Sequence, residues 1–233
     1  MASILVVTAV AAERDAVADG IGAPHAVRLG PYAGRRCETA GPDVVIVAGG
    51  VGPAAAAAVA AHVLATDDIF LVVSMGIAGA FASARLATGD AVVATTIVAA
   101  DLGAMSPERF LDLTALGLDG GASVTCDPVL VGTARDRLVG AGLHVAVGAV
   151  LTLSTMTGTS ERAAQLMAEH GAVAEAMEGA GVAHVAALHE KPVLEVRTVS
   201  NTVGERDRSV WDLTGALNAL TRASAALFRE PLR

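Results

Sequence analysis

Aromatic residues and lysine are scarce in this chain of 233 residues. Phe, Trp and Tyr together make up 3% of it, and Lys191 is the only lysine. Hydrophobic residues nevertheless make up 53% and the mean hydropathy is +0.57, so we expect a sizeable core filled mainly by Ala, Val and Leu. The length fits one large domain or two small ones, and no break in composition favours two. We therefore expect one domain over residues 1–233.

The chain also lacks clusters of positive charge. Its net charge is −8, and no run of basic residues is longer than two. A protein that binds a nucleic-acid backbone needs clustered cations to neutralise the phosphates. The composition therefore predicts no nucleic-acid partner.

Cysteine is rare and isolated, because Cys37 and Cys126 are the only two and neither belongs to a CxxC motif. This pattern predicts two free thiols in a reducing compartment. The first apolar run, residues 4–12, has no charged region ahead of it. No stretch approaches the ~20 apolar residues of a membrane span. We expect a cytoplasmic protein with no membrane partner.

Motifs that define several common catalytic and cofactor sites are missing. No GxGxxG follows the first predicted strand and no GxxxxGK[ST] is present, which argues against a dinucleotide fingerprint and a P-loop. HExxH and sets of Cys and His with metal-ligand spacing are also missing, as is the GxSxG of a serine hydrolase. The sequence therefore predicts neither a metal nor a cofactor.

Instead, apolar β-branched runs alternate with helical patterns. Buried strands are predicted at residues 4–8, 44–48, 69–74, 91–98, 145–152 and 193–200. Edge strands are predicted at 27–29 and 35–39 around a turn at 31–34, and a further strand-like segment spans 172–175. Helices are predicted at 13–18, 53–65, 160–169, 177–189 and 213–227. The alternation indicates an α/β fold around one sheet.

Two glycine-rich turns each follow a predicted strand, at residues 49–52 and 76–79. Glycine lets the backbone approach a ligand closely, and N–H groups at helix N-termini favour anions or hydroxyls. The glycines of these turns fit either tight packing of the backbone or contact with a ligand. The least regular segment, residues 101–127, fits either a loop over a site or an ordinary surface excursion.

Three charged residues are candidates for a site. Glu13 follows the first strand, where open α/β sheets bind ligands, although its position alone favours a solvated acid at a helix start. Glu178 heads a predicted helix. Arg197 lies inside an apolar strand, where a guanidinium needs an acidic partner such as Glu13, Glu178 or Glu195. A structural ion pair and a catalytic one both fit Arg197.

The order of these segments resembles the nucleoside phosphorylase and nucleosidase superfamily over nearly the whole chain. The resemblance is carried by VTAVAAE (7–13), AGGVG (48–52), SMGIAG (74–79), GDAVV (89–93), AMEG (176–179) and VRTVSN (196–201). It implies a three-layer α/β/α sandwich with a central mixed sheet. It also implies an enzyme that cleaves a purine nucleoside with water, without a cofactor, as a homodimer or larger homo-oligomer.

The resemblance further implies a role for individual residues. Glu13 matches the base that activates the attacking water, and Glu178 the carboxylate that holds the ribose hydroxyls, with Met177 packed on the sugar. Arg197 matches a strand arginine near the water and the base carboxylate. Both carboxylates would stabilise an oxocarbenium-like transition state. The nucleoside would also be bordered by Met156, Ala78 and Gly79.

Asn201 distinguishes between purines within this resemblance. Adenine-releasing members carry Asp at the matching position. The carboxylate of that Asp would face O6 of hypoxanthine with acceptor against acceptor, whereas the amide of Asn201 can donate to O6 or N7. A buried polar group left unpaired costs about 1–3 kcal/mol. We therefore expect release of hypoxanthine from a 6-oxopurine nucleoside. The branch that the chain resembles acts on a 6-oxopurine nucleoside that carries a carboxyphenyl ketone at its 5′ end.

The chain departs from the adenine-releasing branch at two positions. Ile77 replaces a serine, and Ala176 replaces a second acid. The substrate carboxylate requires a cation, for which Arg208, Arg206 and Arg109 are candidates, unless they are simply solvated.

Three other functions fit the sequence less well. A nucleoside phosphorylase would need an anion site beside the apolar Ile77. An adenosine-type thioether nucleosidase is disfavoured by Asn201. A non-catalytic nucleoside sensor is disfavoured by the presence of Glu13, Glu178 and Arg197 together.

Overall fold

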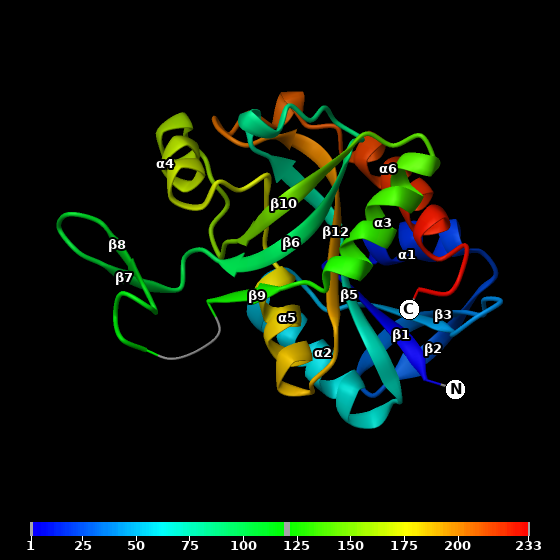
Figure 1. The fold of residues 1–233 in the computed structure, drawn as a ribbon. Helices are drawn as coiled ribbons and strands as arrows, with labels where there is room; N and C mark the ends of the chain where they lie inside the picture. Colours follow the sequence, from blue (N-terminus) through cyan, green and yellow to red (C-terminus); the bar gives the residue numbers. More distant parts are fainter. Residues whose placement is uncertain (1, 119–121, 233) are drawn as a thin grey trace.

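The computed structural model describes residues 2–118 and 122–232, and these form three layers with a sheet in the middle (Figure 1). The strands are β1 (Ser3–Thr8), β2 (Pro24–Leu29), β3 (Tyr32–Cys37), β4 (Val44–Ala48), β5 (Ile69–Ala80), β6 (Ala91–Ala99), β7 (Gly103–Met105), β8 (Phe110–Asp112), β9 (Ser123–Thr125), β10 (Val145–Thr152), β11 (Ala174–Ala176) and β12 (Val193–Thr202). The helices are α1 (Ala11–Ile21), α2 (Pro53–Thr66), α3 (Pro128–Gly140), α4 (Ser160–His170), α5 (Gly179–Leu188) and α6 (Leu213–Leu227).

The main sheet has the order β11-β10-β6-β12-β5-β1-β4-β3-β2, with β9 beside β6. The central strands β4, β1, β5 and β12 are parallel, so their carboxyl ends meet at one edge. β6 is antiparallel to β12, which makes the sheet mixed, as predicted. Near that edge β11 also pairs with the end of β5, where Glu175 lies opposite Gly79. This extra pairing brings the residues around β11 to the carboxyl ends of the central strands.

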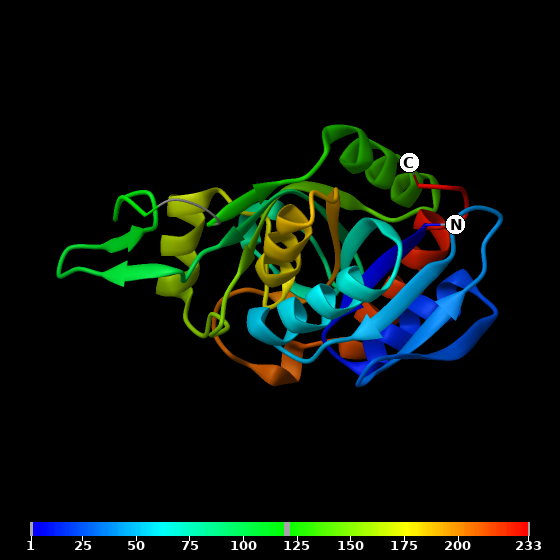
Figure 2. The ribbon, with the colours of Figure 1, turned by 90° about the horizontal axis from the view of Figure 1, so that it is seen from below.

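Helices cover both faces of the sheet. α2 and α5 pack together on one face, while α1, α6 and α3 cover the other (Figure 2). Ala, Val and Leu make up most of the core, as the low aromatic content predicted: all six residues of β1 are buried, and α6 buries its face of Ala and Leu. No described helix is long and apolar enough to cross a membrane.

The predicted elements exist, but several limits were wrong. The turn between β2 and β3 is at Gly30 and Pro31, not 31–34, because Gly30 takes up the left-handed conformation (φ 57°). β5 continues six residues past its predicted end, and β11 starts two residues later than predicted. The helix expected from Met177 begins at Gly179, after Glu178 as its N-cap. Helix α3 was not predicted, although Asp127 caps it and Pro128 opens it.

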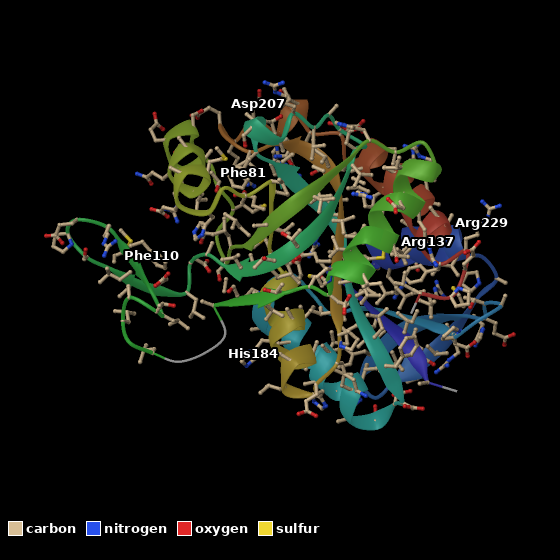
Figure 3. The ribbon with its side chains drawn as sticks, viewed as in Figure 1. Phe81, Phe110, Arg137, His184, Asp207 and Arg229 are labelled. Carbon is tan, nitrogen blue, oxygen red and sulfur yellow. The ribbon has the colours of Figure 1, made fainter. Side chains whose placement is uncertain are left out.

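Over residues 103–112, the segment predicted to be either a loop over a site or a surface excursion is a surface excursion, while residues 123–125 form β9 of the main sheet. Its strands β7 and β8 form a hairpin that extends away from the body of the molecule (Figures 1 and 2). Phe110 lies on this hairpin (Figure 3), and Met105 is 79% exposed. Part of the segment, residues 119–121, lies outside the described residues.

The contact between α2 and α5 yields a test of the fold. A methyl group on Gly181 of α5 would overlap the carbonyl oxygen of Pro53 at the start of α2. Because the backbones would have to separate, we expect Gly181→Ala to lower the free energy of unfolding by about 1–3 kcal/mol in a urea titration.

The matched control is Gly132→Ala in α3, where nothing lies within 4 Å of the added methyl group. Alanine at an unstrained helical position stabilises by about 0.4–1 kcal/mol. Equal effects of the two substitutions would contradict the close packing of α2 on α5.

Candidate active site

A cavity of about 250 Å³ opens at the carboxyl ends of the central strands, beside the N-terminus of α5. Residues that were predicted to bind the nucleoside meet there. They come from α1, from β5, from the loops after β10 and β11, and from β12. The cavity is lined by Ala9, Val10, Glu13, Val51, Ile77, Ala78, Gly79, Met156, Thr157, Glu175, Ala176, Met177, Glu178, Ser200, Asn201 and Trp211. Of the predicted site residues, Arg197 and Arg208 do not line it.

Glu13 lies at one side of the cavity and is only 3% exposed. Its carboxylate accepts backbone N–H bonds from Ala9 (2.9 Å) and Val10 (3.1 Å) at one oxygen, and from Ile77 (2.9 Å) at the other. The solvated helix-start acid that its position alone favoured is therefore not what the structure shows. Burial raises the pKa of Glu13, and the bond from Ile77 and the charge of Arg197 oppose that rise. The apolar side chain of Ile77 does not matter for this contact, because its backbone makes the bond.

Glu178 faces the cavity from the start of α5 and is also buried. One of its oxygens accepts the N–H of Gly52 at 3.2 Å, and the other accepts from Arg197 at 3.3 Å. Gly52 has a φ of 95°, which favours glycine. The turn at residues 49–52 therefore combines tight backbone geometry with a direct contact to a site carboxylate.

Arg197 lies beneath the cavity floor and is 1% exposed. Its guanidinium donates to Glu195 (2.8 Å), to Glu178 (3.3 Å) and to the hydroxyl of Ser74 (3.0 Å). Glu13 is close as well: a methyl group on Gly76 would lie 2.6 Å from Glu13 Oε1 and 2.7 Å from the Arg197 guanidinium. Of the acids considered as partners, Glu195 and Glu178 bond to Arg197, and Glu13 lies close to it.

The far end of the cavity has a carboxylate and an amide on either side of Gly79. Gly79 is paired in register with Glu175 on β11 and with Asn201 on β12. The side-chain oxygen of Asn201 accepts from Ser200 at 2.8 Å, and its NH₂ group donates to the carbonyl of Thr202 at 3.0 Å. Glu175 accepts the backbone N–H and the hydroxyl of Thr157. Burial raises the pKa of Glu175, against the lowering effect of both Thr157 bonds.

Sequence reasoning missed Glu175, Thr157 and Trp211 as lining residues. Glu175 is three residues before Glu178, and this short spacing was only a weak signal for a site residue. The sequence could not place Glu175 at the cavity, because its position depends on the pairing of β11 with β5. Trp211, the only tryptophan, lines the cavity from the loop after β12.

The arginines considered for a substrate carboxylate lie outside the cavity wall. The guanidinium carbons of Arg206 and Arg208 are 5.5 Å and 5.9 Å from the centre of the Trp211 ring, within the range of a cation–π contact. Asp207 between them is exposed, at the outer edge of the molecule (Figure 3). Arg109 is on the projecting β7–β8 hairpin, so the cavity of the same chain has no contribution from it.

A second hollow, between α3 and α6, contains Arg137 and Arg229 (Figure 3). The guanidinium of Arg137 is already engaged, because it donates to the carbonyls of Leu227, Glu230 and Pro231. That arginine closes the end of α6. Among the described residues, no group of three or more His, Cys, Asp and Glu side chains has the arrangement of a metal site.

Residues 3–233 match the sequence profile of the phosphorylase superfamily. The chain belongs to this superfamily. It is 46% identical to the futalosine hydrolase of Acidothermus cellulolyticus over 96% of this chain and 89% of that protein. It is also 46% identical to the futalosine hydrolase of Streptomyces coelicolor, over 96% and 94% of the two chains.

Solved structures of the superfamily share the fold. The 5′-methylthioadenosine/S-adenosylhomocysteine nucleosidase from Neisseria meningitidis, in complex with methylthio-immucillin-A, superposes with a TM-score of 0.84. The superposition covers 98% of this chain and 99% of that one at 23% sequence identity. At that identity the likeness concerns the fold, which is the predicted three-layer α/β/α sandwich around a mixed sheet.

The burial of Glu13 predicts that the stability of the chain depends on pH. Its pKa is raised in the folded chain, so the folded state holds the proton more tightly than the unfolded state. Both states are protonated below the ordinary value of 4.5, and ionisation penalises folding as the pH rises through the raised pKa. We expect Glu13→Gln, which removes this penalty, to gain stability relative to the wild type as the pH increases above 4.5.

Urea titrations of both proteins across this pH range measure the difference. A constant offset from the altered hydrogen bonds of Gln is independent of pH and does not affect the slope. The exposed Glu38→Gln serves as the control, because it replaces a carboxylate that is not buried. A stability difference for Glu13→Gln that stays flat with pH would contradict the raised pKa.

Proposed function

We propose that this chain is a futalosine hydrolase. It cleaves the N-glycosidic bond of futalosine with water and releases hypoxanthine and dehypoxanthine futalosine, a step of menaquinone biosynthesis by the futalosine route. The observation that carries the proposal is the identity of 46% with two futalosine hydrolases over 96% of the chain. The cavity supports it, because its carboxylates and amide fit a purine nucleoside.

Glu13 is the proposed general base. Three backbone N–H bonds fix the direction of its carboxylate, and burial raises its pKa toward the range in which a carboxylate accepts a proton effectively. It takes a proton from a water that attacks C1′ of the ribose. The hydroxyl of that water ends on the sugar, and a proton ends on the departing purine.

Glu178 is the proposed ribose ligand, with Met177 against the sugar. Its carboxylate retains lone pairs beyond those used by Gly52 and Arg197, and these accept the 2′ and 3′ hydroxyls. Cleavage develops positive charge on the ribose ring, so the anions Glu178 and Glu13 stabilise the transition state electrostatically.

Asn201 and Glu175 support hypoxanthine as the leaving base. A 6-oxopurine presents acceptors at O6 and N7 and a donor at N1. The Asn201 amide retains an N–H for an acceptor, and Glu175 is an acceptor on the other side of Gly79. Glu175 also occupies the N–H of Thr157, so that backbone donor is not free to bind N1 of adenine. Met156, Ala78 and Gly79 would border the base.

The geometry disfavours the alternative functions. A phosphorylase needs a cation for phosphate, yet Arg197 is buried and bonded to Glu195, Glu178 and Ser74, and the anionic Glu13 would repel phosphate. A thioether nucleosidase for adenosine-type substrates is disfavoured by the Asn201 donor. A sensor without catalysis does not account for the fixed carboxylate of Glu13.

The remaining assignments stay predictions. Arg208, next to Trp211, is the proposed partner of the carboxyphenyl group. A homodimer or larger assembly is supported by the apolar side chains exposed on and beside the β7–β8 hairpin, such as Leu102 and Met105, and sedimentation of the purified chain would measure it. A cytoplasmic location fits the pathway and the buried free thiols of Cys37 and Cys126.

The proposed reaction predicts which base the chain releases. Incubation of the purified chain with futalosine, inosine and methylthioadenosine, followed by chromatography of the bases, should give hypoxanthine from futalosine at the highest kcat/KM. The rate should be the same with and without phosphate, because water is the nucleophile. Adenine as the main product, or a rate that requires phosphate, would overturn the proposal.

The identity of residue 201 predicts the base preference. In Asn201→Asp the carboxylate faces O6 of hypoxanthine without a donor, so we expect kcat/KM for futalosine relative to methylthioadenosine to fall about 10–100-fold. Ser200→Ala is the matched control, because it removes the hydroxyl that holds Asn201 but keeps the amide. An unchanged ratio in Asn201→Asp would refute the assignment.

A further inference from the structure

Glu195 is a buried acid that the proposed reaction does not use. It lies on β12 below the cavity, is 0% exposed and does not line the cavity. One of its oxygens accepts Nε–H of Arg197 at 2.8 Å. The other has no hydrogen-bond partner among the described residues. A carboxylate in this position is costly, which calls for a reason beyond packing.

Two features of the surroundings of Glu195 favour its ionised form, although the net shift of its pKa is upward. Its carboxylate lies against Gly179 at the N-terminus of α5, and a methyl group on Gly179 would overlap both of its oxygens. The partial positive charge at a helix N-terminus stabilises an anion there. The Arg197 guanidinium adds a full positive charge at hydrogen-bond distance. Burial acts in the opposite direction and raises the pKa of Glu195.

The bond to Glu195 also fixes the orientation of Arg197. With Nε directed at Glu195, the two terminal nitrogens of the guanidinium point to Glu178 and Ser74. Three carboxylates, those of Glu13, Glu178 and Glu195, thus share one guanidinium. The charge that Arg197 exerts on Glu13 and Glu178 therefore depends on how far Glu195 neutralises it.

We propose that Glu195 is a positioning residue of the active site, which orients Arg197 and neutralises part of its charge so that Glu13 remains a sufficiently strong base. This role rests on the proposed function, in which Glu13 activates water. Without the Glu195 charge, the guanidinium would stabilise the anionic form of Glu13 more strongly and so weaken Glu13 as a base.

The other groups that face Glu195 are consistent with this assignment. Cys126, which follows β9, has its pKa raised to about 12 by burial and by the Glu195 charge, so its thiol stays neutral. Ser74 on β5 is uncharged. Glu178 and Arg197 are therefore the charged groups that act directly on Glu195, and Arg197 links it to Glu13.

Glu195→Gln tests the charge while keeping the shape and the acceptor for Arg197. The acid limb of the pH profile of kcat/KM for futalosine should move to lower pH by about 1 unit, because a neighbouring charge shifts a pKa by about 1–3 units. Ser74→Ala is the matched control: it removes another partner of Arg197 but no charge, so its acid limb should not move. An unmoved acid limb in Glu195→Gln would overturn the proposal.

A second measurement, made on the wild-type chain, does not depend on catalysis or on the folding of a variant. Titration of the glutamate side-chain carboxyl carbons of the wild-type chain by NMR should show Glu195 ionised at neutral pH, and a protonated Glu195 there would overturn the proposal. In Glu195→Gln the same titration should show a lowered pKa of Glu13. If the wild type fails to release a base from futalosine, the proposed function fails, while these titrations still decide the role of Glu195.

Discussion

The buried guanidinium of Arg197 is the interaction on which the site depends. It lies where three structural segments meet, and it bonds to Glu195 on its own strand, to Ser74 on β5 and to Glu178 at the start of α5. Removing one partner from a buried ion pair leaves an uncompensated charge and is strongly destabilising. The positions of the two carboxylates that face the cavity are therefore coupled through a group that does not itself line it.

Backbone N–H groups provide the second constraint on the site. Glu13 is held by Ala9, Val10 and Ile77, and Glu178 by Gly52. These bonds need backbone geometry rather than particular side chains, which explains why an isoleucine suffices at position 77. Small residues make the geometry possible, because Gly181 lets α5 approach the start of α2 and so brings Glu178 to the turn at Gly52.

Most strands and the last helix were predictable because their signals are local. β4 and β10 and helix α6 have the predicted limits, since apolar runs and a helical spacing of leucines depend on neighbours in the sequence. β11 was misplaced by two residues, because a three-residue strand is defined by its partners β10 and β5. Helix α3 was missed although its Asp127–Pro128 start is a recognised signal, since its apolar pattern is weak.

The sequence alone determined the fold class, the superfamily and the residue types available for chemistry, because these follow from periodicity and from motifs in a fixed order. It also provided Glu13, Glu178 and Asn201, which the structure brings to one cavity. Only the tertiary structure decided the partners of Arg197 and the place of Glu175 opposite Gly79. Apart from Glu195, which lies on the same strand as Arg197, the residues in these contacts are far apart in the chain or on different elements. The packing of strands and helices, not local spacing, sets which side chains meet.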